Sequence, residues 1–69
     1  MSEITETLEN ISEQLQEAIY DAEKFDLGNN SAGTRVRKAM QNIKSLAQNV
    51  RLEVQAQKNG VLAYLLKHH

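Results

Sequence analysis

The residues with the clearest potential for chemistry are cations and glutamines that alternate at spacings of four and three in the second half of the chain. They are Arg37, Gln41, Lys44, Gln48, Arg51, Gln55 and Lys58. On an α-helix these positions form one stripe, in which cations seven residues apart are separated by about 10.5 Å, at about 1.5 Å per residue. Cations neutralise phosphate groups, and glutamine amides can donate hydrogen bonds to phosphate or sugar oxygens. The pattern therefore indicates a surface that contacts the DNA backbone without reading its sequence.

Two further cations, Arg35 and Lys38, precede and follow the first residue of this stripe. They lie near the expected start of the helix, where free backbone amides also favour an anion. The alternative interpretation is that the stripe is only the solvated flank of a coiled coil, since such flanks are commonly basic. In the antiparallel register that we expect, Arg37 faces Asp26 and the other cations of the stripe face uncharged residues. We therefore predict one salt bridge across the hairpin.

The sequence contains few residues that could form a catalytic or metal-binding site. Both histidines, His68 and His69, end the chain, where a purification tag would look the same. Several glutamates between Glu6 and Glu17 share a helix face, but a di-metal site in a helix bundle also needs a Glu-x-x-His pair, which is absent. The glycines at positions 28 and 33 lack a P-loop lysine. We expect no enzyme, no metal or cofactor and no small-molecule substrate.

Length and composition favour a small protein that associates with itself. A chain of 69 residues allows one domain with a marginal core, and it has no cysteine with which to staple that core. The longest apolar run, residues 61–66, is far too short to span a membrane. We expect a soluble homo-oligomer, with a dimer favoured and no membrane partner, located in the cytoplasm, at the nucleoid or in a virion.

Charge is divided unequally between the two halves of the chain. Residues 1–26 hold eight acids against Lys24, which gives −7, whereas residues 27–69 hold seven cations against Glu53, which gives +6. The formal net charge of −1 conceals this division. An asymmetry of this kind indicates contact with nucleic acid or assembly guided by charge.

The elements that must carry these residues are two helices. The first is predicted over about residues 2–25, because its apolar residues recur at alternating steps of four and three, which is the seam of a coiled coil. These residues are Ile4, Leu8, Ile11, Leu15, Ala18, Ala22 and Phe25. Residues 26–31 are rich in turn formers, with Gly28 suited to the left-handed position after a helix and Asn30 or Ser31 suited to cap the next helix.

The second helix is predicted over about residues 32–58, and its apolar stripe is wider than one partner helix can cover. We expect a break or kink near Gly60, followed by a short apolar helical tail over 61–67 that is buried against the first helix or a second subunit. The fold class is then all-α, an antiparallel two-helix hairpin resembling a coiled coil, which dimerises into a four-helix bundle. The expected oligomer interface comprises Val36, Ala39, Met40, Ile43, Leu46, Val50 and Val54.

The run Ala-Gly-Thr-Arg-Val-Arg-Lys-Ala-Met at residues 32–40 resembles the bacterial, chlamydial-type linker-histone-like family. The resemblance continues through Ile43-Lys44, Leu46-Ala47-Gln48 and Val50-Arg51, and covers about residues 24–59. It implies a helical, nucleoid-associated protein that binds DNA with little sequence preference. The DNA-contacting residues that it implies are Arg35, Arg37, Lys38, Lys44 and Arg51, to which the stripe adds Lys58.

The acidic first helix supports a second hypothesis of a different class. A segment of charge −7 beside the basic helix repels phosphate within a Debye length of about 8 Å at physiological salt. The alternative is therefore a structural or adaptor protein that assembles through helix–helix contacts and has no nucleic-acid role.

Overall fold

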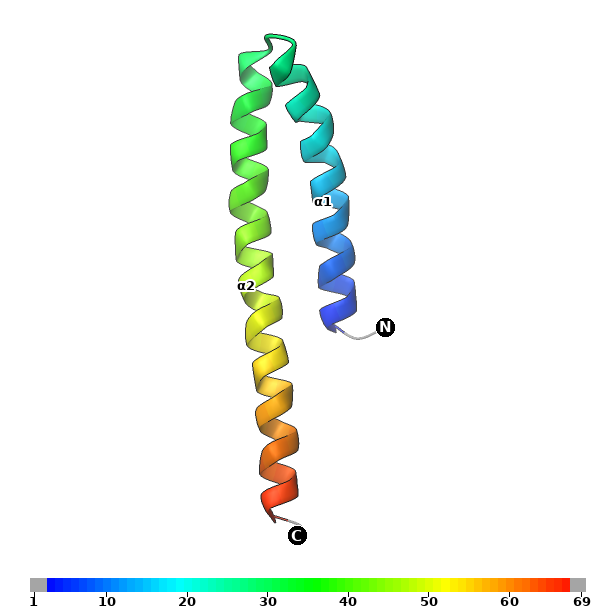
Figure 1. Cartoon of the computed structure of the whole chain (residues 1–69), viewed down its shortest axis with the longest axis vertical. Coiled ribbons are helices and arrows are strands. Elements are labelled where there is room, and N and C mark those ends of the chain that lie inside the picture. Colours follow the sequence, from blue (N-terminus) through cyan, green and yellow to red (C-terminus); the bar gives the residue numbers. More distant parts are fainter. Residues whose placement is uncertain (1–2, 68–69) are drawn as a thin grey trace.

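The structure is a computed structural model in which the backbone is described for residues 3–67 and the side chains for residues 3–60. Two α-helices, α1 (Glu3–Asp26) and α2 (Asn30–Lys67), lie side by side and antiparallel (Figure 1). Residues 3–67 contain no strand. The expected all-helical hairpin is confirmed, whereas the four-helix bundle stays a prediction. No helix within these residues is long and apolar enough to cross a membrane.

The turn between the helices is shorter than the expected 26–31, because only Leu27–Asn29 lie outside the helices. Gly28 adopts a φ of 102°, in the left-handed region that a side chain disfavours. The Gly28 N–H donates to the Phe25 carbonyl at 2.9 Å and the Asn29 N–H donates to the Lys24 carbonyl at 3.1 Å. These two bonds form a Schellman motif, which satisfies the last carbonyls of α1 and reverses the chain at once.

Asn29 caps the second helix. Its side-chain oxygen Oδ1 accepts a hydrogen bond from the Ala32 N–H at 3.2 Å, as an N-cap residue does for the third residue of a helix. The expected caps, Asn30 and Ser31, are wrong because both already lie inside α2. The Schellman motif determines where α2 begins. The backbone N–H of Asn29 donates to the last turn of α1, and the side chain of Asn29 caps the first turn of α2.

Helix α2 continues through Gly60 without interruption, so the expected break there is wrong. A glycine in a helix interior costs only about 1 kcal/mol, which a helix of 38 residues tolerates. Because α1 has 24 residues, α2 extends well past the first residue of α1 (Figure 1). The expected burial of the tail side chains, and His68 and His69, lie outside the described part.

The two helices meet along a narrow seam with little true core. On α2 the half-buried apolar residues that face α1 are Val36, Ala39, Ile43, Leu46, Val50 and Val54. Within residues 3–60, the only apolar side chains that are fully buried are the small ones of Ala18 and Ala32, at 4% and 0% exposure. No large side chain is buried, so the isolated hairpin has a weak hydrophobic core.

The α1 side of the seam is rotated from the expected one. Ile4, Ile11, Ala18 and Ala22 face α2 as expected, but three expected seam residues, Leu8, Leu15 and Phe25, are exposed. Their places along the seam are taken by the half-buried polar side chains of Thr7, Gln14 and Asp21. The spacing of apolar residues could not predict this rotation of α1, because it takes no account of the polar residues that also lie in the seam.

Candidate nucleic-acid interface

Four exposed cations, Arg37, Lys44, Arg51 and Lys58, lie along one face of α2. We call this set the basic stripe. Because α2 is uninterrupted, the stripe is about 32 Å long, from 21 residue steps at about 1.5 Å each. None of the four cations makes an ion pair within residues 3–60. Their charge is therefore available to a ligand.

Three exposed glutamines, Gln41, Gln48 and Gln55, lie beside the basic stripe on the outer side of α2. The Gln55 amide donates to Asn59 Oδ1 at 3.3 Å, a contact within the same helix. Gln41 and Gln48 make no side-chain hydrogen bond within the described residues, and with Lys44 they line a shallow hollow on α2. Their amides can donate to phosphate or sugar oxygens next to a neutralised phosphate.

The other two predicted cations, Arg35 and Lys38, lie away from the basic stripe. Both line a hollow between the helices together with the acids Glu17 and Asp21 of α1. Arg35 Nε donates to Asp21 Oδ1 at 3.0 Å, which closes an ion pair across the hairpin. One residue turns a helix by about 100°, so neighbours of Arg37 in sequence point to other faces. Six cations predicted as one site are therefore divided into four on one face and two beside acids.

The number of salt bridges across the hairpin was predicted correctly, but the partners were wrong. Within residues 3–60 the ion pair joins Arg35 to Asp21, and Arg37 makes no ion pair with Asp26. The turn explains the register, because Asp21 and Arg35 each lie seven residues from Gly28. Counting outward from Gly28 would have identified this pair from sequence, since an antiparallel hairpin sets residues equally far from its turn opposite each other.

The acids of α1 do not neutralise the basic stripe. Glu6, Glu9, Glu13 and Glu17 are exposed and make no ion pair within residues 3–60. No group of acids or histidines in the described residues could hold a metal ion.

Lys24, the cation of α1, has its Nζ 4.4 Å from the centre of the Tyr20 ring, a cation–π contact that the sequence analysis missed. The sequence signal for this contact was the spacing of four residues between Tyr20 and Lys24, which places both side chains on the same side of the helix.

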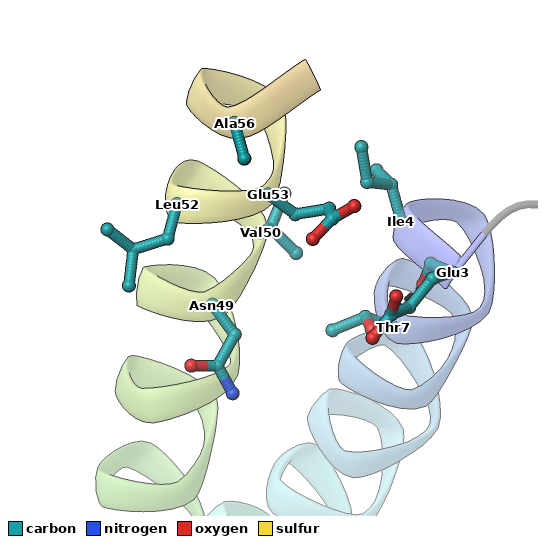
Figure 2. A pocket seen from close by; sticks show the side chains of 8 residues that line it. All are labelled: Glu3, Ile4, Thr7, Asn49, Val50, Leu52, Glu53 and Ala56. Atoms are coloured by element: carbon teal, nitrogen blue, oxygen red, sulfur yellow. Dashed lines mark hydrogen bonds between the residues drawn. The ribbon is translucent and has the colours of Figure 1, made fainter. Parts of the chain in front are cut away.

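The open end of the hairpin lies opposite the turn. There a hollow is lined by residues of both helices, namely Glu3, Ile4 and Thr7 of α1 and Asn49, Val50, Leu52, Glu53 and Ala56 of α2 (Figure 2). Leu52 points away from α1, whereas Glu53 points toward it (Figure 2). Glu53 accepts a hydrogen bond from Gln57 Nε2 at 3.2 Å and has no cationic partner within residues 3–60. This end carries acidic groups from both helices and is a poor phosphate site.

The predicted oligomer interface overlaps the intramolecular seam. The structure places six of the seven residues half-buried where α2 faces α1, namely Val36, Ala39, Ile43, Leu46, Val50 and Val54. Of the expected set, Met40 is the large side chain that is exposed, at 41%. The oligomer interface itself stays a prediction.

Comparison with known families places most of the hairpin in one family. The family model of histone H1-like protein Hc1 matches residues 5–60, which include most of α1, the turn and the entire basic stripe. No curated protein and no solved structure shows a significant match. The resemblance over residues 24–59 is confirmed and extends over the acidic helix as well. The chain belongs to the histone H1-like protein Hc1 family.

Proposed function

We propose that this protein is a nucleoid-associated protein that binds DNA by contacting phosphates through the basic stripe, without strong sequence preference. Membership of a histone H1-like family supports a DNA-binding, nucleoid-associated function. One observation supports the assignment of the basic stripe to phosphate contact. Its four cations are exposed on one face of a continuous helix, and no acid of the described residues pairs with them.

The physical basis of this binding is the release of counterions. Each phosphate that a cation neutralises lowers the slope of log K against log salt by about 0.9. A dimer that neutralises about four phosphates therefore predicts a slope near −3.6. Arg35 and Lys38 add positive charge, but Arg35 is engaged by Asp21, so the direct contacts come from the stripe.

A matched pair of lysines tests the proposal. Lys44→Ala removes a cation from the basic stripe, whereas Lys24→Ala removes one from α1 and changes the net charge equally. Fluorescence anisotropy with a labelled duplex, measured over a range of salt, should show a slope reduced by about 0.9 for Lys44→Ala. The slope for Lys24→Ala should match that of the wild type. Equal effects of both substitutions, or no binding by the wild type at low salt, would overturn the proposal.

The protein is proposed to act without catalysis and at the nucleoid. Histone-like families of this kind are typically non-enzymatic. The described residues hold no cluster that could bind a metal ion, and the basic stripe offers charge but no sheltered nucleophile or base.

A second candidate function is that of a structural protein that assembles through helix contacts. It is favoured by several large apolar side chains that remain exposed on the hairpin, among them Leu8, Leu15 and Met40. Under either function the protein is proposed to form a homodimer. Sedimentation tests this directly, because a dimer doubles the chain mass of 7.8 kDa.

A further inference from the structure

One dipeptide next to the last cation of the basic stripe, Asn59-Gly60, can change its own covalent structure. The side-chain amide of an asparagine is open to attack by the backbone nitrogen of the residue that follows, and a following glycine leaves that nitrogen unhindered because it has no Cβ. The other five asparagines of the chain are followed by a residue with a side chain. After three of them, Asn10, Asn42 and Asn49, that residue is the β-branched isoleucine or valine.

The surroundings of the dipeptide leave both reacting groups accessible. Residues 55–60 are all exposed, and a Cβ added at Gly60 would meet nothing within 4 Å. The Asn59 oxygen Oδ1 accepts a hydrogen bond from Gln55 Nε2 at 3.3 Å. A donor at this oxygen stabilises the negative charge that develops on it when the amide carbon is attacked.

The end of α2 that carries the dipeptide has no helix beside it. The hollow at the start of α1 reaches along α2 as far as Ala56, and past that point no other part of residues 3–67 lies next to α2 (Figure 1). The remaining 11 residues, from 57 to the end of α2 at Lys67, are fewer than the 12–15 or so that an isolated helix needs in water. Gly60 weakens this segment by about a further 1 kcal/mol.

Local opening of the helix decides whether the attack can occur. In an intact α-helix the N–H of Gly60 is bonded to the carbonyl of Ala56, which holds the nitrogen away from the Asn59 side chain. Segments with few buried contacts open with a free energy near zero, without unfolding the rest of the protein. The unsupported end of α2 is such a segment, so the nitrogen is released often.

Asn10 provides an internal comparison on α1. It is exposed like Asn59, and its Oδ1 accepts from Gln14 Nε2 at 3.1 Å, again a glutamine four residues away. However, Asn10 lies between two half-buried residues of the seam, Thr7 and Ile11. Its turn of helix is therefore held by α2 and opens only when the hairpin opens.

We propose that Asn59 is a site of spontaneous deamidation that lowers the positive charge at the end of the basic stripe. The backbone nitrogen of Gly60 forms a bond to Cγ of Asn59 and the Cγ–Nδ2 bond breaks. The proton of the Gly60 N–H leaves with the amide group as ammonia. Water then opens the succinimide ring at one of its two carbonyls and leaves an aspartate or an isoaspartate. The reaction consumes one water and needs no oxidant or enzyme.

Both products place a negative charge beside Lys58. The new carboxylate lies within a Debye length, about 8 Å at physiological salt, and repels a phosphate bound there. Isoaspartate also carries the chain through its side-chain carbon, which adds an atom to the main chain and interrupts the helical hydrogen bonds at this point. The effect on DNA binding rests on the proposed function, whereas the reaction itself is independent of it.

The reaction is tested by incubating the native chain, and the same chain unfolded in urea, in one mildly alkaline buffer. Peptide mapping by mass spectrometry follows the loss of the amide at Asn59 and at Asn10, and dividing each native rate by the rate in urea removes the effect of the following residue. Folding should slow the reaction at Asn59 by less than about tenfold, and that at Asn10 by more than tenfold. Slowing of Asn59 beyond tenfold, or equal slowing of both asparagines, would overturn the proposed site.

The consequence for binding is tested with two substitutions that each change the net charge from −1 to −2. Asn59→Asp reproduces the aspartate product and should weaken duplex binding about two- to threefold at low salt. Asn10→Asp adds the same charge on α1, beside Gln14, which lines the hollow of Arg35 and Lys38 away from the basic stripe. It should leave binding unchanged.

Equal effects of the two substitutions would contradict the proposed effect of deamidation on the stripe. A wild type that deamidates at Asn59 but binds no DNA would contradict the proposed function and leave the modification site intact. A chain that binds DNA and keeps Asn59 unmodified, under conditions in which the urea-unfolded chain reacts, would contradict this inference alone.

Discussion

The Phe25 ring at the end of α1 packs directly onto the backbone of Gly33 in α2. A Cβ added at position 33 would lie 2.6 Å from both Cδ1 and Cε1 of the ring, which is closer than real Cβ atoms approach other atoms. The contact occurs about one helical turn after the chain reverses at Gly28. Gly33 is therefore needed for the close approach of the helices and not for a special backbone conformation.

The first prediction compares the two glycines inside α2. Gly33→Ala should lower the melting temperature, because the added Cβ must displace the Phe25 ring. Gly60→Ala should raise the melting temperature, with a gain of up to about 1 kcal/mol in helix stability, because a Cβ there meets nothing within 4 Å. Thermal unfolding followed by circular dichroism measures both. A stabilising Gly33→Ala would show that the ring contact is not part of the folded hairpin.

The second prediction concerns the cap of α2. Asn29→Ala should destabilise the hairpin by about 1 kcal/mol, because it removes the oxygen that accepts from the Ala32 N–H. Asn30→Ala is the matched control, since Asn30 already lies within the helix and alanine has the higher helix propensity. Urea unfolding of both variants checks this. A larger loss for Asn30→Ala would contradict the position of the cap.

The third prediction concerns the acid in the seam. Glu53 is half-buried in the same row as Ala39 and Leu46, and it lines the open end with Glu3, a like charge. Glu53→Leu should stabilise the hairpin by about 1 kcal/mol, because it continues the apolar row and removes an unpaired charge. Glu53→Gln, which removes only the charge, separates the two contributions. An unchanged urea midpoint for Glu53→Leu would indicate that the end of the seam is open to water.

The fourth prediction concerns the ion pair between Arg35 and Asp21. The Arg35 side chain is 47% exposed and that of Asp21 is 19% exposed, so water screens the pair. A double-mutant cycle with Arg35→Gln and Asp21→Asn should give a coupling of about 0.5 kcal/mol that shrinks in high salt. The same cycle between Arg37 and Asp26 should give a coupling near zero. A stronger coupling in the second cycle would mean that the register of the hairpin is different.

The local features of this protein could be predicted from its sequence. Two helices, a reversal at Gly28 and a row of cations every seven residues all follow from periodicity and from turn chemistry, which depend on residues close together in the chain. The family resemblance was found over about residues 24–59, and the matching region proved larger, at residues 5–60.

Only the tertiary structure decided how the helices are rotated against each other. Thr7, Gln14 and Asp21 occupy the seam while Leu8 and Leu15 remain exposed, and the pattern of apolar residues alone did not contain that choice. The physical reason is that a helix repeats its side chains locally, whereas its rotation reflects the packing of all side chains on both helices. For the same reason the sequence determined the spacing of the basic stripe, whereas the fold decided that its four cations are exposed and make no ion pair within residues 3–60.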